Sequence, residues 1–214
     1  MFIAGIDLSG PSNIKDTALT CFQCRADYLH LVHAQQNVSD REIVDLIVDC
    51  QQQAGLVIGL DAPLSYNPGG GDHPADSELR KLIVKTGLRS GSVMTPTAPR
   101  MVYLTLRGLS LAHILSNLVS EPISIVETHP GAVLALHGAP IDNVVNLKSS
   151  KTVQNDLLYW LEQQGVQGAA TLKDSGDHMI AACASAFGAW KWQNDESQWL
   201  RKADPPFHPF DFAC

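Results

Sequence analysis

Short apolar runs separated by turn residues open the chain, a pattern typical of β-strands. The first run, Phe2 to Leu8, is followed by Ser-Gly-Pro, and two further runs cover Thr17 to Gln23 and Tyr28 to Gln35. Arg25-Ala26-Asp27 separates the second run from the third and has the composition of a tight hairpin connection. The pattern therefore predicts three strands in an antiparallel meander.

A helix and a fourth strand are predicted next. Ser39 begins the sequence Ser-Asp-Arg-Glu, a capping box in which Glu42 lies three residues after the cap. Apolar residues then recur at helical spacing, at Ile43, Leu46, Ile47 and Cys50. Gly55 ends this helix, and the apolar strand Leu56 to Leu60 ends at Asp61. Because a helix connects them, we expect the fourth strand to run parallel to its predecessor in the sheet.

Residues 62–108 are rich in proline and glycine and contain one predicted short helix, from about Asp76 to Lys85. The stretch is too long for a simple connection, so we interpret it as a functional insertion or a lid. A helix from Leu104 to Leu118 and a fifth strand from Ile123 to Glu127 follow. The remaining predicted helices lie near Ala132 to His137, from about Ser150 to Gln164 and from about Asp174 to Trp192. We expect the tail, which contains Pro205, Pro206 and Pro209, to be irregular.

Composition favours one globular domain that covers residues 1–214, because hydrophobic residues make up 45% and charged residues 17%. The formal net charge of -7 argues against a protein that coats nucleic acid non-specifically, but not against a nuclease. We expect the five cysteines to be reduced, as in a cytoplasmic protein. The sequence shows no signal peptide and no apolar segment long enough to cross a membrane.

Acidic residues stand at the ends of three predicted strands, at Asp7, Asp61 and Glu127. Ligands of open α/β sheets gather beyond the carboxyl ends of the strands. A fourth acidic position opens the last helix, where Asp174 and Asp177 are spaced to lie on one helical face. Each acid alone is explained as a turn residue or a helix cap. Together they predict a common site.

Four converging carboxylates repel one another unless a cation lies between them. Carboxylate oxygens suit Mg²⁺ and Mn²⁺, and two such ions can activate water and stabilise the leaving oxygen of a phosphodiester. The hypothesis that follows is metal-dependent phosphodiester hydrolysis by a nuclease. A structured or short nucleic acid and a small phosphorylated compound both remain open as substrates.

The order of these features resembles the ribonuclease-H-like superfamily: an aspartate in the first strand, a three-strand meander, an acid after the fourth strand and Asp-x-x-Asp before an alanine-rich helix. The segment Asp174 to Ala182 is similar to the terminal motif of Holliday-junction resolvases. The chain looks most like a family of predicted ribonuclease-H-like nucleases, domain of unknown function 429. The motifs are Gly5-Ile6-Asp7, Gly59-Leu60-Asp61-Ala62-Pro63, Val126-Glu127-Thr128-His129-Pro130 and Asp177 onward.

This resemblance spans nearly the whole chain and implies an α/β fold with a mixed five-stranded sheet, a meander and then parallel strands, flanked by helices. Carried over by position, it makes four residues the catalytic metal ligands for Mg²⁺ or Mn²⁺: Asp7, Asp61, Glu127 and Asp177. Asp174 would be an auxiliary residue. His178 stands where alanine often follows the helix aspartate, which leaves open whether it assists catalysis or is only tolerated.

Basic residues between the fourth and fifth strands are candidates for phosphate contacts, namely Arg80, Lys81, Arg100 and Arg107. A solvated helix face is an equal explanation for the first two. His129 follows Glu127 by two residues, so strand alternation would place both side chains on one face. There His129 could position a water or a phosphate, or serve only a structural role.

Two alternative functions remain open on the same core fold. An actin-like or sugar-kinase-like nucleotide binder also opens with an aspartate and a small-residue turn, as in Asp7-Leu8-Ser9-Gly10. Such proteins normally need two domains of this kind to enclose ATP, and 214 residues are too few for two. A binding module without catalysis is the second alternative. The sequence also leaves open whether the chain forms a homodimer.

Overall fold

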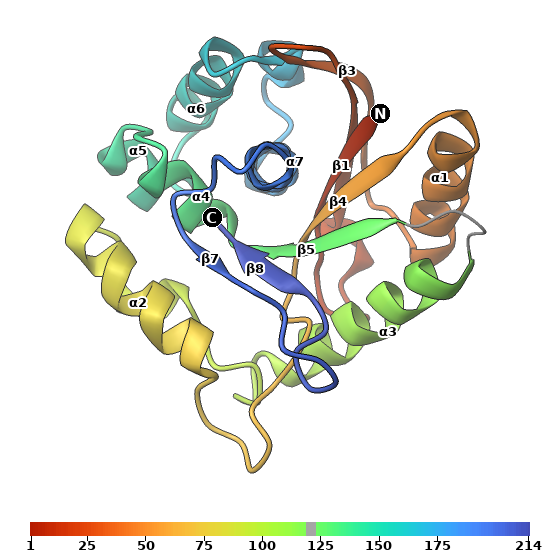
Figure 1. The fold of residues 1–214 in the computed structure, drawn as a ribbon. Coiled ribbons are helices and arrows are strands. Elements are labelled where there is room, and N and C mark those ends of the chain that lie inside the picture. Colours follow the sequence, from red (N-terminus) through yellow and green to blue (C-terminus); the bar gives the residue numbers. More distant parts are fainter. Residues whose placement is uncertain (119–122) are drawn as a thin grey trace.

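One mixed sheet of eight strands organises the computed structural model, which describes residues 1–118 and 123–214 (Figure 1). The strand order is β6-β3-β2-β1-β4-β5-β8-β7. The strands are β1 (Phe2–Asp7), β2 (Ala18–Cys24), β3 (Leu29–Gln36), β4 (Leu56–Asp61), β5 (Ser124–Thr128), β6 (Val166–Gln167), β7 (Leu200–Arg201) and β8 (Asp211–Ala213). The prediction of an α/β fold with a mixed sheet is confirmed.

The predicted meander is confirmed, because β1 pairs antiparallel with β2 and β2 antiparallel with β3. The Arg25 N–H donates to the Tyr28 carbonyl at 2.8 Å and closes the hairpin between β2 and β3. The capping box at Ser39 and Glu42 is also present at the start of α1 (Asp40–Gln53). From α1 the chain enters β4, which runs parallel to β1 and thus in the same direction as β3.

The sheet is larger than the five strands predicted, and the expectation of an irregular tail was wrong. β8 pairs parallel with β5, and β7 pairs antiparallel with β8, so the tail builds one edge of the sheet. Phe212 and Ala213 are buried there. The prolines that suggested an irregular tail lie in the connection between β7 and β8. β6 adds a short parallel pairing to β3 at the opposite edge.

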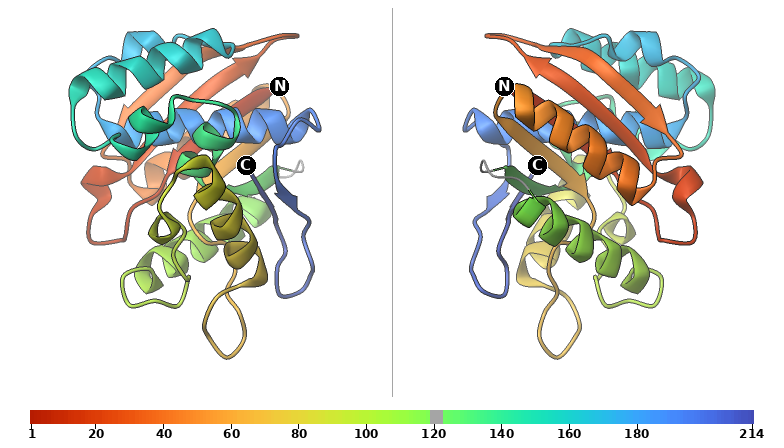
Figure 2. Two further views of the ribbon diagram at one scale, coloured as in Figure 1. Left: turned by 90° about the vertical axis from the view of Figure 1, so that its left-hand side faces the viewer. Right: turned by 90° about the vertical axis from the view of Figure 1, so that its right-hand side faces the viewer.

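Helices cover both faces of the sheet (Figures 1 and 2). α1 and α3 (Val102–Leu118) lie on one face, where Ile43, Ile47 and Leu111 pack against the sheet. The other face is covered by α7 (Asp177–Gln193), α4 (Pro130–Leu136) and α6 (Lys151–Gln163), with α5 (Ile141–Val145) and α2 (Pro74–Thr86) beside them. Short 3-10 turns cover Ile14–Asp16, Ser90–Ser92 and Ala169–Leu172.

The stretch 62–108, interpreted as an insertion or a lid, contributes to the core. Its helix α2 buries Ala75, Leu79 and Ile83 in the same apolar cluster as Val126. Its end merges into α3, which covers the opposite face of the sheet. Within the described residues, no helix is both long enough and apolar enough to cross a membrane.

Helix α7 lies unusually close to the two central strands because glycines face it. A Cβ built on Gly5 would stand 2.0 Å from the Ala182 carbonyl oxygen, and one on Gly59 would stand 2.2 Å from the Ser185 carbonyl oxygen. The backbone of α7 thus occupies the space that side chains would fill. This contact fixes where the start of α7 meets the ends of β1 and β4.

We expect Gly5→Ala to destabilise the protein by about 1–3 kcal/mol or more, because the added methyl group would push α7 from the sheet. Denaturant unfolding monitored by circular dichroism would measure the change. Gly55→Ala is the matched control, since a Cβ at Gly55 meets nothing within 4 Å. Equal stability of the two variants would contradict the close packing of α7.

Candidate active site

Asp7 and Asp61 stand side by side at the carboxyl ends of β1 and β4, where they are partners in the parallel register. Each lies two residues beyond a glycine that faces α7, so alternation directs both carboxyl groups toward α7. Asp7 is only 8% exposed, and Asp61 is half-buried. The two strands therefore place a pair of shielded carboxyl groups together.

The electrostatics of this pair are unfavourable without a cation. Burial is the largest cause that raises the pKa of Asp61 well above its ordinary value, followed by the charge of Asp7 and a hydrogen bond with Asp7. Bringing the two carboxyl groups together therefore disfavours the charged form of Asp61.

The start of α7 brings two further groups to the pair, Asp177 and His178. The Nδ1 atom of His178 lies 2.6 Å from Oδ2 of Asp7. This hydrogen bond raises the pKa of His178, against the opposing effect of burial. The Oδ2 atom of Asp177 lies 3.8 Å from Nζ of Lys148. His178 thus contacts the strand aspartate directly.

Asp174 does not share a helical face with Asp177, contrary to the sequence prediction. The helix begins only at Asp177, after Gly176 with φ of 90° as its N-cap. Asp174 itself has a φ of 63° and precedes the helix. Its carboxylate lies 3.7 Å from Nζ of Lys151, separate from the other acids. The glycine and the left-handed aspartate form the turn that delays the helix start.

Glu127 reaches the site from a different direction. It is in register with Leu60 rather than with Asp61, so its side chain leaves β5 on the α3 face of the sheet. Its Oε2 accepts a hydrogen bond from the Leu64 N–H at 2.9 Å. Burial raises the pKa of Glu127 to about 8 despite this hydrogen bond, which acts in the opposite direction.

All four predicted acids line a cleft formed by two adjoining cavities at the strand ends. Asp7, Asp61, Asp177 and His178 line a cavity of about 360 Å³. Asp61 and Glu127 line another of about 320 Å³. The two cavities share Asp61, Ser92, His129 and Lys148 in their walls. We call their union the carboxylate cleft.

The carboxylates do not enclose an ion in the arrangement described. Across residues 1–118 and 123–214, no group of three or more His, Cys, Asp or Glu side chains is placed to hold a metal. His178 forms a hydrogen bond with one oxygen of Asp7, and Lys148 lies near the carboxylate of Asp177. Glu127 lies on the other face of the sheet. The acids share a cleft without yet forming a coordination shell.

His129 lies in the cleft, but not as part of a strand. It is the N-cap of α4, with Nδ1 accepting from the Ala132 N–H at 3.0 Å. Its Nε2 therefore carries the proton and donates to the Ser92 carbonyl at 2.9 Å. Burial lowers the pKa of His129, so the ring is neutral at pH 7. The strand β5 ends at Thr128, and His129 lines the same cavity as Glu127.

The four predicted phosphate-binding residues do not line either cavity of the carboxylate cleft. Arg107 is buried and forms an ion pair with Asp40 at 2.7 Å while Nη1 donates to Thr17 Oγ1 at 2.8 Å. Arg80 pairs with Asp72 at 2.6 Å. Lys81 and Arg100 are exposed elsewhere on the surface.

The positively charged side chain at the cleft is instead that of Lys148, which no sequence pattern indicated. Its side chain is 83% exposed at the edge of the cleft, and its charge lowers the pKa of Asp61. Lys148 follows α5, far in sequence from the strand acids. A lysine in a polar connection carries no local signal that could have distinguished it from a solvated one.

A family model described as protein of unknown function (DUF429) matches residues 5–205. The chain belongs to the DUF429 family. The resemblance drawn from its short motifs is thereby confirmed at the level of the family. The residues matched in this DUF429 protein include all four acids of the carboxylate cleft. Comparison with curated proteins and with solved structures gave no match.

We expect Asp61→Asn to stabilise the metal-free protein at pH 8 but not at pH 4. An acid whose folded pKa lies above its unfolded value lowers stability progressively as pH rises from the unfolded pKa toward the folded one. The variant removes this penalty, and each pKa unit corresponds to about 1.4 kcal/mol. Chemical denaturation in a chelating buffer at both pH values would measure the effect.

Asp156→Asn, at an exposed position on α6, is the control and should show no such pH dependence. A destabilisation by Asp61→Asn that is the same at both pH values would contradict the repulsion between Asp7 and Asp61.

Proposed function

We propose that this protein hydrolyses phosphodiester or related phosphate ester bonds with the help of Mg²⁺ or Mn²⁺ held in the carboxylate cleft. The observation that carries the proposal is the shielded pair of Asp7 and Asp61, whose carboxyl groups are forced together by the parallel register of β1 and β4. Two buried carboxylates repel each other and so destabilise the fold. A divalent cation bound between them would turn this repulsion into attraction to the cation.

The residues present fit such a cation. Burial and the charge of Asp7 raise the pKa of Asp61, and a divalent cation between the two carboxyl groups would offset their repulsion. Asp177 adds a third carboxylate from α7, and Glu127, from the other face of the sheet, lines one cavity together with Asp61. Oxygen ligands suit Mg²⁺ and Mn²⁺ better than the softer metals. Asp7 would offer the cation its other oxygen while Oδ2 keeps its contact with His178, and Asp177 would give up its contact with Lys148.

The arrangement of the sheet supports the same proposal. The central strands follow the order β3-β2-β1-β4-β5, with β2 antiparallel to its neighbours. This agrees with the meander and parallel strands that the ribonuclease-H-like resemblance implies. The acids also stand at the strand ends where such folds place their ligands.

The chain's own groups have distinct roles in this proposal. When bound, the cation supplies activation of water and stabilisation of charge on the phosphate oxygens. His178 is held at Nδ1 by Asp7, and its Nε2 has no protein partner in the described ranges. It can therefore exchange a proton with the substrate. Lys148 contributes a positive charge at the edge of the cleft, where it can contact a phosphate oxygen.

We expect the protein to cleave members of a panel of DNA, RNA and small phosphodiester substrates in Mg²⁺ or Mn²⁺. Asp7→Asn should reduce the rate by about a hundredfold or more, because it removes a charge needed to hold the cation. Rates of product formation at saturating metal would measure this. Asp156→Asn should cleave as the native protein does. Stabilisation by ATP without cleavage of any substrate would favour the actin-like alternative instead.

Metal binding can be measured apart from cleavage. Mn²⁺ should raise the melting temperature of the native protein, because a ligand bound only to the folded state stabilises it. The shift should be lost in Asp7→Asn and retained in Asp156→Asn. An equal shift in all three proteins would place the metal outside the carboxylate cleft.

A further inference from the structure

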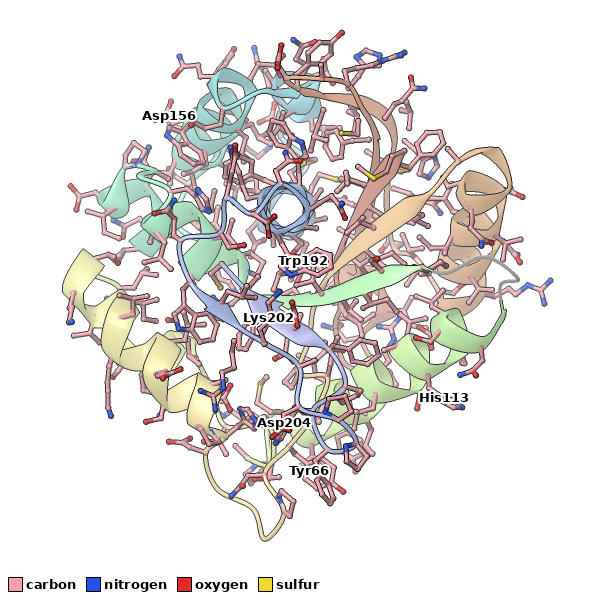
Figure 3. All side chains as sticks on the ribbon, viewed as in Figure 1. Tyr66, His113, Asp156, Trp192, Lys202 and Asp204 are labelled. Carbon is pink, nitrogen blue, oxygen red and sulfur yellow. The ribbon has the colours of Figure 1, made fainter. Side chains whose placement is uncertain are left out.

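A third cavity, of about 110 Å³, adjoins the carboxylate cleft on its far side from His178. It is the smallest of the three and shares Asp76, Glu127 and Phe212 with the neighbouring cavity. Its walls come from the start of α2 and from tail residues 201–212. Figure 3 shows Lys202 and Asp204 on this tail segment, which runs beside α2 (Figure 2). We call it the tail cavity.

His73 presents a hydrogen-bond donor to the tail cavity. It is the N-cap of α2 and only 8% exposed. Its Nδ1 accepts from the Ala75 N–H at 3.0 Å, so the proton of the neutral ring must be on Nε2. Within the part of the chain that the structure describes, Nε2 has no hydrogen-bond partner. Because it carries the proton, this nitrogen is a donor rather than a metal ligand.

Two positive side chains line the same cavity. Arg201 faces Glu78 at 3.8 Å, and Lys202 faces Asp211 at 3.0 Å. Arg201, Glu78 and Lys202 are exposed, whereas Asp211 is largely buried. Exposed charged side chains gain little from such pairs, so a ligand can compete for Arg201 and Lys202. Ser65 and His208 add polar groups that bond to each other at 2.8 Å.

The start of α2 strengthens the preference for an anion. Helix α2 has 13 residues, and Pro74, Ala75 and Asp76 of its first turn line the cavity. The positive end of the helix dipole therefore points toward it. Three carboxyl groups also line the cavity. Asp76 accepts from the His73 N–H and Glu127 from the Leu64 N–H, while Asp204 is exposed.

We propose that the tail cavity binds a phosphate group, through the Nε2–H of His73 and the side chains of Arg201 and Lys202. The proposal that this phosphate belongs to a substrate rests on the proposed function of the carboxylate cleft. The 320 Å³ cavity of the carboxylate cleft lies between the tail cavity and Asp61, because it is lined by Asp61 and shares Glu127 with the tail cavity. A substrate would therefore carry a terminal phosphate in addition to the bond that is cleaved.

Binding of inorganic phosphate, measured by calorimetry in a chelating buffer, tests the site itself. Arg201→Ala and Lys202→Met should each weaken binding by about tenfold, as expected when a charged hydrogen-bond partner is lost. His73→Asn should weaken it similarly while still capping α2. Arg41→Ala, at an exposed position of α1, is the matched control and should bind as the native protein does. Absence of binding, or equal binding by Arg201→Ala, Lys202→Met and the native protein, would overturn the proposal.

Asp7→Asn separates this inference from the proposed function. It should abolish cleavage and leave phosphate binding unchanged, whereas a loss of phosphate binding would move the anion to the carboxylate cleft and overturn the proposal. If no substrate is cleaved but Arg201→Ala still weakens phosphate binding, the hydrolytic function fails and the anion site stands. With a cleaved oligonucleotide, Arg201→Ala should raise KM about tenfold only when the substrate carries a terminal phosphate. An equal change in KM for a substrate without a terminal phosphate would show that the tail cavity does not bind the terminal phosphate of the substrate.

Discussion

The close approach of α7 to the two central strands is the constraint on which the rest of the structure depends. Gly5 and Gly59 remove the side chains that would otherwise hold the helix away from the sheet. The helix carries Asp177 and His178 at its start, and the strands carry Asp7 and Asp61 at their ends. Because the helix lies on the sheet backbone, these four residues line one cavity. Packing, rather than any attraction among the acids, assembles the site.

The electrostatic consequence is repulsion between the carboxyl groups of Asp7 and Asp61. Burial and the neighbouring charge of Asp7 raise the pKa of Asp61, and His178 compensates on the other side of Asp7. His178 thus partly offsets the charge of Asp7. Among the described residues, no three or more His, Cys, Asp or Glu side chains are placed to hold a metal.

The tail gives the cleft a second wall of a different character. β8 extends the sheet beyond β5, and the connection from β7 brings Arg201, Lys202 and His208 toward the start of α2. The tail cavity therefore combines these positive side chains with carboxyl groups, whereas Lys148 is the lysine that lines the carboxylate cleft.

Local patterns in the sequence were sufficient for strands β1 to β5, the capping box at Ser39 and the acids at the ends of β1, β4 and β5, because period and capping depend on neighbours along the chain. The resemblance to the family, rather than local pattern, singled out the four acids that line the carboxylate cleft. Local patterns could not show that His178 bonds to Asp7, because those residues are 171 positions apart. Nor could they show that Arg107 forms an ion pair with Asp40. Tertiary packing decides which charged side chains form ion pairs and whether a proline-rich tail joins a sheet edge. Only packing brings distant segments together and excludes water from between them.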